Sequence, residues 1–202
     1  IKAGERVAKF RMKGIYENID KTDSLSVTFN LLAKDENVWD LYGTRTRVQM
    51  QKACPFELST FEGYCLLTSS FFSAYMTNTE HRLLQAERDK TEDNTIILHD
   101  FFYKNYDLKI KYDPSDPLKP FVEFDDQIIG STAEAFGTIY GNGKLMCTQP
   151  VAYDSYYNVC QKFVFLYSTI YVVGKGTVGT YVNILEWISD EEAEQYKKEE
   201  GL

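Results

Sequence analysis

Residues 162–187 read KFVFLYSTIYVVGKGTVGTYVNILEW, two apolar arms on either side of a glycine-rich segment. The two arms, residues 162–173 and 180–187, are rich in aromatic and β-branched residues, which fit the pleated surface of a sheet. Between them, Gly174-Lys-Gly176-Thr-Val-Gly179 matches the dinucleotide-binding pattern G-x-G-x-x-G. That pattern binds a pyrophosphate only where a helix begins at the glycines. Strand-forming residues follow here instead, so the glycines predict a hairpin turn between two strands.

Strand patterns recur along most of the chain. Residues 24–31 and 44–50 alternate polar and apolar side chains, with the two-residue period of half-buried antiparallel strands. Residues 66–76 are apolar and aromatic, which predicts a strand buried on both faces. Further strands are expected at residues 9–13, 95–98, 107–112 and 121–124, and as a hairpin of residues 133–140 and 144–149 around Gly141-Asn142-Gly143. The sequence therefore predicts a mainly β fold, an antiparallel sandwich or barrel of about ten short strands.

One or two minor helices accompany these strands. Residues 79–90 predict an internal helix, with Thr79 as its cap. Ser189-Asp-Glu-Glu192 has the spacing of a capping box, so a second helix is expected after it. This segment is polar and acidic, and it should fray because it has little to bury.

The domain organisation follows from these elements. We predict a single β-rich domain over residues 1–188 and an acidic helical tail over residues 189–202. Three of the five prolines fall within residues 113–120. That segment is either a linker between two halves or a long surface loop, and the strand-rich sequence on both sides favours the loop.

Composition and charge limit the classes of partner. The 202 residues carry a net charge of −8, which disfavours broad binding to nucleic acids or to anionic membranes. The longest mostly apolar run, residues 163–173, is far shorter than the roughly 20 residues of a membrane-spanning helix. No signal peptide is recognisable, and because the chain begins at Ile1 we expect a processed product or an excised domain.

The four cysteines leave two possibilities open. Their spacing fits neither a zinc site nor a C-x-x-C redox motif. If the protein is oxidised, the short local pairs Cys54–Cys65 and Cys147–Cys160 are the natural disulfides. The alternative is four buried free thiols, since free cysteine is among the most buried residue types.

The sequence carries no recognisable catalytic or metal-binding motif. His81 and His99 are the only histidines, and neither lies in a metal-ligand spacing. Neither a nucleophile elbow nor a phosphate-binding loop occurs. Asp125 and Asp126 are adjacent, so in a strand they would point to opposite faces and work poorly as an acid–base pair. We therefore predict no enzyme, no cofactor and no metal.

Two surfaces are candidates for binding. The first is a loop that combines aromatic anchors with adaptable hydrogen-bonding groups, a composition typical of recognition loops. The second is a basic face that would form if residues 9–13 and 44–50 were neighbouring strands. The candidate residues are Tyr153, Asp154, Ser155, Tyr156, Tyr157 and Asn158 in the loop, and Lys9, Arg11, Lys13, Arg45 and Arg47 on the basic face.

A tyrosine-rich β domain followed by the acidic stretch from Ser189 to Glu200 resembles, in organisation, the projecting spike domain of astrovirus-type capsid proteins. The resemblance implies a β-rich homodimer on a virion surface that attaches to host cells. It carries no individual binding residue across. Under this reading the partner is a cell-surface glycan or protein and the location is the virion surface or the extracellular space.

Two other readings stay open. One is an OB-type single-stranded nucleic-acid binder that uses the basic face and aromatic stacking, with the acidic tail as a regulator. The other is a lipocalin-like barrel for a small ligand, although no Gly-x-Trp motif occurs near the N-terminus. A homodimer is expected in any case, because β modules often cover an exposed strand edge with a second copy.

Overall fold

The protein was analysed as a computed structural model that describes residues 11–20, 24–32, 44–76, 79–117 and 119–200. The chain divides into two compact units, residues 1–54 and 55–202. A single domain over residues 1–188 stays a prediction. None of the helices in the described part of the chain has the length and apolar character needed to cross a bilayer.

The first unit contains one hairpin-like pair of strands. β1 (Ser24–Asn30) and β2 (Arg45–Gln51) are antiparallel, with Val27 opposite Val48. A short 3₁₀ turn, η1 (Tyr16–Asn18), precedes them. Both strands were predicted from their alternating pattern, and both are confirmed.

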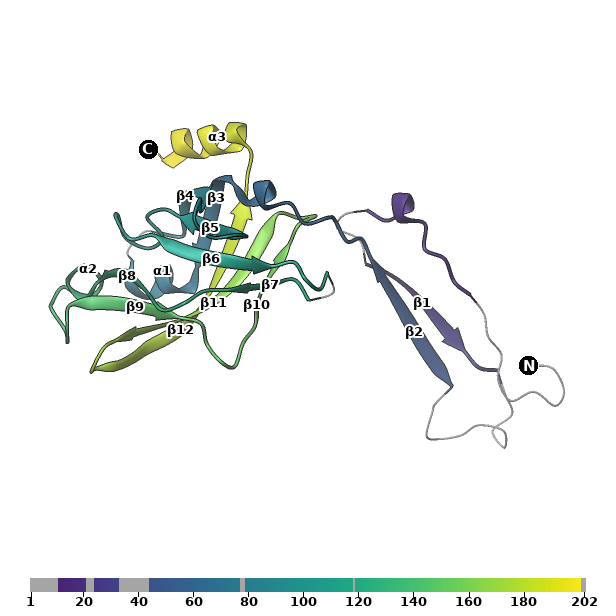
Figure 1. The fold of residues 1–202 in the computed structure, drawn as a ribbon, viewed down its shortest axis with the longest axis horizontal. Coiled ribbons are helices and arrows are strands. Elements are labelled where there is room, and N and C mark those ends of the chain that lie inside the picture. Colours follow the sequence, from purple (N-terminus) through teal and green to yellow (C-terminus); the bar gives the residue numbers. More distant parts are fainter. Residues whose placement is uncertain (1–10, 21–23, 33–43, 77–78, 118, 201–202) are drawn as a thin grey trace. The chain divides into compact units, whose positions relative to one another are not determined.

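The second unit is an antiparallel sheet with short helices at its ends (Figure 1). Within the described residues ten strands form this sheet. Its elements, in chain order, are η3 (Leu58–Phe61), β3 (Gly63–Ser69), α1 (Ser70–Tyr75), β4 (His81–Arg88), β5 (Thr95–Leu98), β6 (Leu108–Asp113), β7 (Phe121–Glu123), β8 (Gln127–Ser131), α2 (Thr132–Phe136), β9 (Lys144–Thr148), β10 (Ser155–Asn158), β11 (Phe163–Val172), β12 (Gly176–Trp187) and α3 (Asp190–Glu200).

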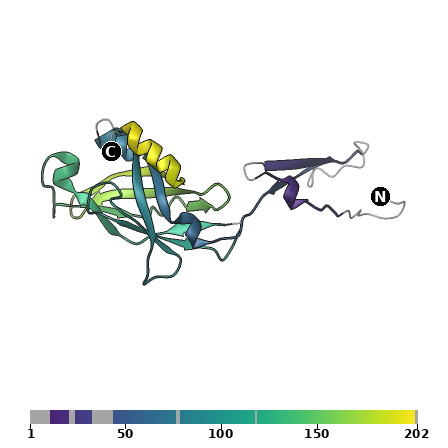
Figure 2. The same cartoon turned by 90° about the horizontal axis from the view of Figure 1, so that it is seen from above.

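Eight of these strands close into a barrel. They run in the order β3-β4-β5-β6-β7-β10-β11-β12, and β12 pairs with β3 to complete the circle. Most neighbours in the barrel are also consecutive strands of the sequence, which makes it an up-and-down barrel. β8 and β9 extend the same sheet as an antiparallel hairpin, because β9 pairs with β11 (Figure 2). The predicted mainly β fold is confirmed.

Strand alternation separates the two surfaces of the barrel wall. In β11 every second residue from Val164 to Val172 is buried, and the residues between them are only partly buried. β6 repeats this pattern, with Leu108, Ile110 and Tyr112 pointing inward. Because side chains alternate across a strand, one set fills the interior and the other set forms the outer face.

The turn glycines of residues 174–179 act as predicted. Gly174 and Gly176 have φ angles of 72° and 114°, in the region that favours glycine. They connect β11 to β12 as a tight hairpin, and a strand follows them rather than a helix. The predicted hairpin is confirmed.

The predicted helix over residues 79–90 is wrong, because this segment is strand β4. It pairs with β3 on one side and with β5 on the other. Leu84, Gln85 and Glu87 are good helix formers, but intrinsic helix propensity is a weak determinant of structure. Two flanking strands offer a full backbone hydrogen-bond ladder, and this tertiary pairing overrides the propensity.

Two further segments were expected as strands and contain helices instead. Residues 66–76 begin as β3 but turn into α1 at Ser70, because the Ser69 side chain caps the helix by accepting the Phe71 N–H. In the segment 133–140, the capping box of Ser131 and Glu134 starts α2. The hairpin partner of β9 is therefore β8, with Ser131 opposite Lys144. By contrast, residues 113–120 connect the paired strands β6 and β7, as the loop reading expected.

The acidic tail folds as α3 with the predicted capping box. The Glu192 N–H donates to Ser189 Oγ at 3.2 Å, and the Ser189 N–H donates to the Glu192 carboxylate at 2.8 Å. The helix is more firmly anchored than expected, because Ala193 is fully buried and Lys197 Nζ lies 4.2 Å from the centre of the Tyr64 ring. α3 therefore packs beside β3 in the barrel unit.

The cysteine pattern differs from both expectations. Cys54 and Cys160 are disulfide-bonded, and Cys65 and Cys147 are buried free thiols. The pairs Cys54–Cys65 and Cys147–Cys160 are therefore wrong, and so is the alternative of four free thiols. Cys65 and Cys147 lie at inward positions of β3 and β9, so strand alternation rather than separation in sequence sets their direction.

Candidate functional site

A groove of about 470 Å³ lies on the barrel wall where the pairing of β6 and β7 ends. β6 pairs with β7 only from Lys111 to Asp113, so Lys109 extends beyond the last paired residue of β7. The chain then crosses residues 124–126 before β8 begins. The residues that line this groove are Glu92, Thr95, Lys109, Ile110, Lys111, Glu123, Phe124, Asp125, Gln127 and Gln149.

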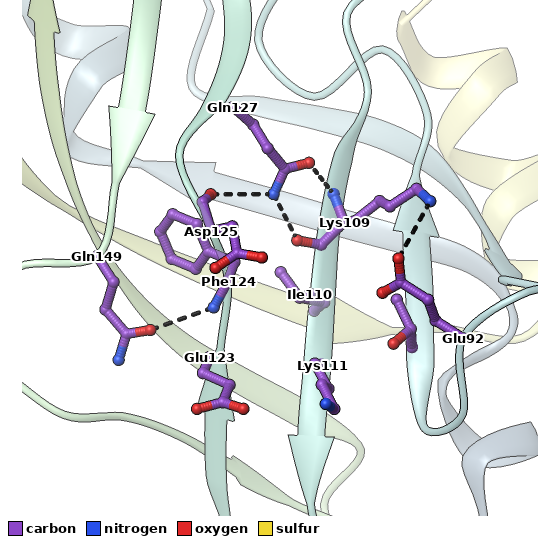
Figure 3. Close-up of a pocket in the computed structure, with 10 residues that line it drawn as sticks. Glu92, Lys109, Ile110, Lys111, Glu123, Phe124, Asp125, Gln127 and Gln149 are labelled. Atoms are coloured by element: carbon purple, nitrogen blue, oxygen red, sulfur yellow. Dashed lines mark hydrogen bonds and ion pairs between the residues drawn. The ribbon is translucent and has the colours of Figure 1, made fainter.

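Two glutamine side chains close the gap in the backbone ladder (Figure 3). The Gln127 amide accepts a hydrogen bond from the Lys109 N–H and donates to the Lys109 carbonyl, both at 2.8 Å. It thus replaces the neighbouring strand that β6 lacks at this point. Gln149 Oε1 accepts the Phe124 N–H at 3.2 Å. The backbone groups of Lys109 and Phe124 at the groove are therefore hydrogen-bonded although no strand pairs with them there.

An ion pair holds one side of the groove. Lys109 Nζ lies 2.5 Å from Asp89 Oδ2 and 4.0 Å from Glu92 Oε1. Only 4% of the Asp89 side chain is exposed, and its other oxygen accepts hydrogen bonds from the N–H and hydroxyl of Thr91. The hydrogen bonds from Lys109 and Thr91 hold the pKa of the Asp89 carboxyl well below its usual range. The Lys109 ammonium is correspondingly held in its charged form, and its pKa is raised.

Other polar groups of the groove are free to contact a ligand. In the part of the chain that the structure describes, the side chains of Lys111, Glu123 and Asp125 form no hydrogen bond or ion pair, and Lys111 has only an electrostatic interaction with the Asp113 carboxylate. Lys111 and Glu123 lie opposite each other on β6 and β7, both at outward positions. The groove therefore offers one ammonium and two carboxylates whose hydrogen-bonding capacity is unused.

Next to the groove, aromatic rings cover the outer surface of three strands. Tyr156 lies 5.4 Å from the nearly parallel ring of Phe165, and Tyr153 lies 4.9 Å from Tyr167. The exposed fractions are 52% for Tyr153, 39% for Tyr156 and 36% for Phe121. We call this surface the outer aromatic face, and it consists of Phe121, Tyr153, Tyr156, Phe163, Phe165 and Tyr167.

The strand register joins the groove to the outer aromatic face. Phe121 of β7 lies opposite Tyr156 of β10, which in turn lies opposite Phe165 of β11. Phe121 and Glu123 are two residues apart on β7 and share its outward side. Two residues of a strand span about 7 Å, so one ligand can contact the carboxylate of Glu123 and the rings together.

The predicted loop of residues 153–158 is mostly a strand, and alternation divides its candidates. Tyr153 and Tyr156 belong to the outer aromatic face, and Asp154 is also exposed. Ser155 and Tyr157 point into the barrel, with 0% and 3% exposed, and Asn158 is partly buried. The Ser155 hydroxyl accepts the Tyr167 N–H at 3.0 Å, and Tyr157 packs on Phe61 and Tyr112, so both are placed to support the fold.

The expected basic face does not form as predicted. β2 pairs with β1, and Arg11 and Lys13 lie outside any strand. Lys9 lies outside the described residues. Arg45 and Arg47 are exposed on β2, and Arg47 donates to the Ser26 hydroxyl at 2.8 Å. In residues 11–13, the described part of the expected strand, the alternating pattern forms no strand, because alternation specifies a strand only where a partner strand pairs with it.

The histidines lie in separate surroundings. His81 on β4 contacts the Thr68 hydroxyl at 2.8 Å, whereas His99 lies between Asp107 at 3.0 Å and Glu87 at 3.3 Å. No group of three or more His, Cys, Asp or Glu side chains that could hold a metal ion is found in the described ranges. Asp126 is engaged as well, since it accepts a 2.6 Å hydrogen bond from the Tyr171 hydroxyl.

Most of this site was not predicted from the sequence. Asp125 entered only as an acid–base partner, and no pattern pointed to Lys111, Glu123 or the two glutamines. One signal for the aromatic face was present, because residues 163, 165 and 167 are Phe, Phe and Tyr at a strict two-residue spacing. In a strand this spacing places all three rings on one side.

A family model described as "Domain of unknown function (DUF4984)" matches residues 41–199. The chain belongs to the DUF4984 family. The DUF4984 match includes the whole barrel, the groove and the outer aromatic face, and it excludes Lys9, Arg11 and Lys13. It carries no information about a capsid, so the resemblance to a spike domain stays a prediction. No curated protein matches the chain, and no solved structure matches it.

Proposed function

We propose that this DUF4984 protein is a non-enzymatic binding module that recognises a cell-surface glycan or protein through its outer aromatic face and groove. The observation that carries the proposal is the exposure of adjoining tyrosines, 52% for Tyr153 and 39% for Tyr156. Tyrosine offers a large contact area and a polar tip at a low cost in conformational entropy. Neighbouring rings left on a surface are typical of interaction sites.

The proposed location is outside the cytoplasm. The disulfide-bonded cysteines Cys54 and Cys160 support it, since structural disulfides persist mainly in oxidising compartments. A binding module outside the cytoplasm can contact glycans and proteins on the surfaces of other cells.

The test uses fluorescently labelled protein on intact mammalian and bacterial cells. Saturable binding that is lost in Tyr156→Ala and retained in Tyr140→Ala is the expected result. Tyr140 is a matched control because 47% of it is exposed and it packs on Phe136 of α2, away from the outer aromatic face. Binding that is absent, or that Tyr156→Ala leaves unchanged, would refute the proposal.

A lipocalin-like small-ligand binder is the second candidate, and a specific observation favours it. An eight-stranded closed barrel is wide enough to hold one small ligand. The Tyr112 hydroxyl and the Trp187 Nε1 are buried in the described interior without a hydrogen-bond partner. Phe61 fills the space between these two rings, at 4.6 Å and 5.1 Å, so a ligand would have to displace it. Saturable quenching of tryptophan fluorescence by an aromatic probe, abolished in Trp187→Phe, would support this candidate.

The nucleic-acid alternative is less favoured. OB folds are five-stranded Greek-key barrels, whereas this barrel has eight strands in up-and-down order. Of the basic residues that it requires, Arg45 and Arg47 lie on β2, whereas Arg11 and Lys13 lie outside any strand. We expect no quenching when the protein is titrated with oligo-dT at low salt, and saturable, salt-sensitive quenching would restore the alternative.

The expected homodimer has a free edge available to it. In the described sheet β8 pairs with β9 alone, and Ile128 on β8 is 36% exposed. Unpaired strand edges are often covered by a second copy of the same chain. Analytical ultracentrifugation at tens of micromolar should therefore give a dimer, and a single monomeric species would contradict this.

A further inference from the structure

The unused polar groups of the groove include both donors and acceptors. The Lys111 ammonium is a donor, the carboxylates of Glu123 and Asp125 are acceptors, and the Gln149 side-chain N–H₂ is a further donor. A ligand that pairs with all of them must itself donate and accept at closely spaced positions. A hydroxyl group does both, so a molecule that carries several hydroxyl groups meets this requirement.

The distribution of charge favours a neutral ligand. Lys109 is already paired with Asp89 at 2.5 Å, which leaves Lys111 as the unpaired cation of the groove among its described residues. Glu92, Glu123 and Asp125 are three carboxylates on the same lining. A polyanion would be repelled by these carboxylates, whereas an uncharged ligand meets no like charge at Lys111 or at the carboxylates.

The aromatic rings supply an apolar contact directly beside this polar strip. Phe121 and Tyr156 form one row across the register, and Glu123 lies one outward position further along β7. A sugar ring has a face of C–H groups and a rim of hydroxyls, so its face fits the rings while its rim reaches the groove. The half-exposed Tyr156 also keeps its phenol hydroxyl available as a donor and acceptor.

An extended peptide fits this surface less well. Peptides that add to a sheet require a free strand edge. β10 is paired with β7 on one side and with β11 on the other, so the rings stand on a closed part of the wall. The backbone of β10, beneath the rings, therefore offers no ladder for a peptide to extend.

We infer that the ligand of the groove and outer aromatic face is a neutral sugar chain, whose rings stack on Tyr156 and Phe121 and whose hydroxyl groups bind Lys111, Glu123 and Asp125. This inference rests on the proposed function and narrows it to one ligand class.

The test is electrophoresis of the full chain in native gels that contain dextran, mannan, galactan or xylan. At least one polysaccharide should retard the wild type and Tyr140→Ala. Tyr156→Ala should weaken the apparent affinity roughly tenfold or more, since buried aromatic anchors dominate such sites. Glu123→Gln keeps the shape of the side chain and should weaken the apparent affinity less than Tyr156→Ala does. Circular dichroism verifies that each variant is folded.

Raising the NaCl concentration gives a second readout. Binding of a neutral chain releases no counterions, so its affinity should change less than twofold between roughly 50 and 500 mM salt. A steep loss of affinity with salt would refute the neutral class. The inference is also overturned if none of the four gels retards the protein, or if Tyr156→Ala is retarded as strongly as the wild type. If cells still bind through Tyr156 in that case, the proposed function stands and only the sugar assignment fails.

Discussion

Tyr156 and Tyr157 are neighbours on one strand, yet 39% of Tyr156 is exposed and only 3% of Tyr157. Tyr157 points into the barrel, where the centre of its ring lies 5.7 Å from that of Phe61 and 5.1 Å from that of Tyr112. Tyr156 points outward and stacks on Phe165. The two-residue period of the strand thus assigns the same residue type to two different tasks. Inner rings stabilise the fold, and outer rings are available for a ligand.

The largest effect is expected when an inner ring is removed. Tyr157→Ala should lower the free energy of unfolding by about 3–5 kcal/mol, because truncating a buried aromatic side chain loses its burial and leaves a cavity. Urea denaturation of the variant and the wild type measures the difference. A loss below about 1 kcal/mol would mean that the inner cluster does not hold the barrel together.

The ion pair beside the groove should give a smaller, pH-dependent effect. The pKa of Asp89 is lowered in the folded state by Lys109 and Thr91, below an unfolded value of about 3.9. Its contribution to stability is therefore fully present above that unfolded value and is lost as the pH falls through the folded pKa. Asp89→Asn should lower the Tm at pH 7, and the difference from the wild type should shrink below about pH 4.

Thermal unfolding followed from pH 7 to pH 2.5 tests this expectation. Asp113→Asn is a comparison on the same surface, since the pKa of Asp113 is lowered mainly by hydrogen bonds from Ser115, with only a smaller electrostatic contribution from Lys111. A difference for Asp89→Asn that stays constant over this range would show that the ion pair is not responsible.

The outward-facing ring of Tyr156 should contribute little to the free energy of unfolding. Tyr156→Ala is expected to cost less than about 1 kcal/mol, the scale of a cross-strand aromatic pair. The same urea experiment applies, with Tyr157→Ala beside it. Equal losses from the two neighbours would remove the distinction between an inner structural face and an outer binding face.

The smallest expected effect is the response of the two inner thiols to a reagent. Burial raises the pKa of the Cys147 thiol to about 12 and that of Cys65 well above its usual value. The native protein should therefore show no reaction with Ellman's reagent, and the unfolded, unreduced protein should show two thiols, Cys65 and Cys147. Any other thiol count in the unfolded protein would contradict the disulfide assignment.

The parts of the fold that could be predicted are those with a local signal. Residues 95–98 and 163–172 have enough aromatic and β-branched side chains to specify strands. Ser189 and Glu192 specify a capping box through their spacing. Residues 79–90 misled the prediction because their propensity is weak and their two partner strands come from other parts of the chain.

The candidate site was harder to predict because it depends on register. Lys111 and Glu123 are twelve positions apart in sequence and meet only because β6 pairs with β7. Tyr156 and Phe165 face each other only because β10 pairs with β11. A single sequence contains each residue but not the pairing that brings these residues to one surface.

Periodicity, glycine and capping residues act over a few positions, so a mainly β chain, the hairpin at Gly174–Gly176 and the capped final helix could be predicted from local patterns. The closure of the strands into an eight-stranded barrel and the identity of Cys54 and Cys160 as the disulfide-bonded cysteines emerged from the folded protein alone. The same holds for which tyrosines are buried and which are exposed. Closure and pairing depend on contacts between distant segments, and their energy comes from shared burial rather than from any one stretch of sequence.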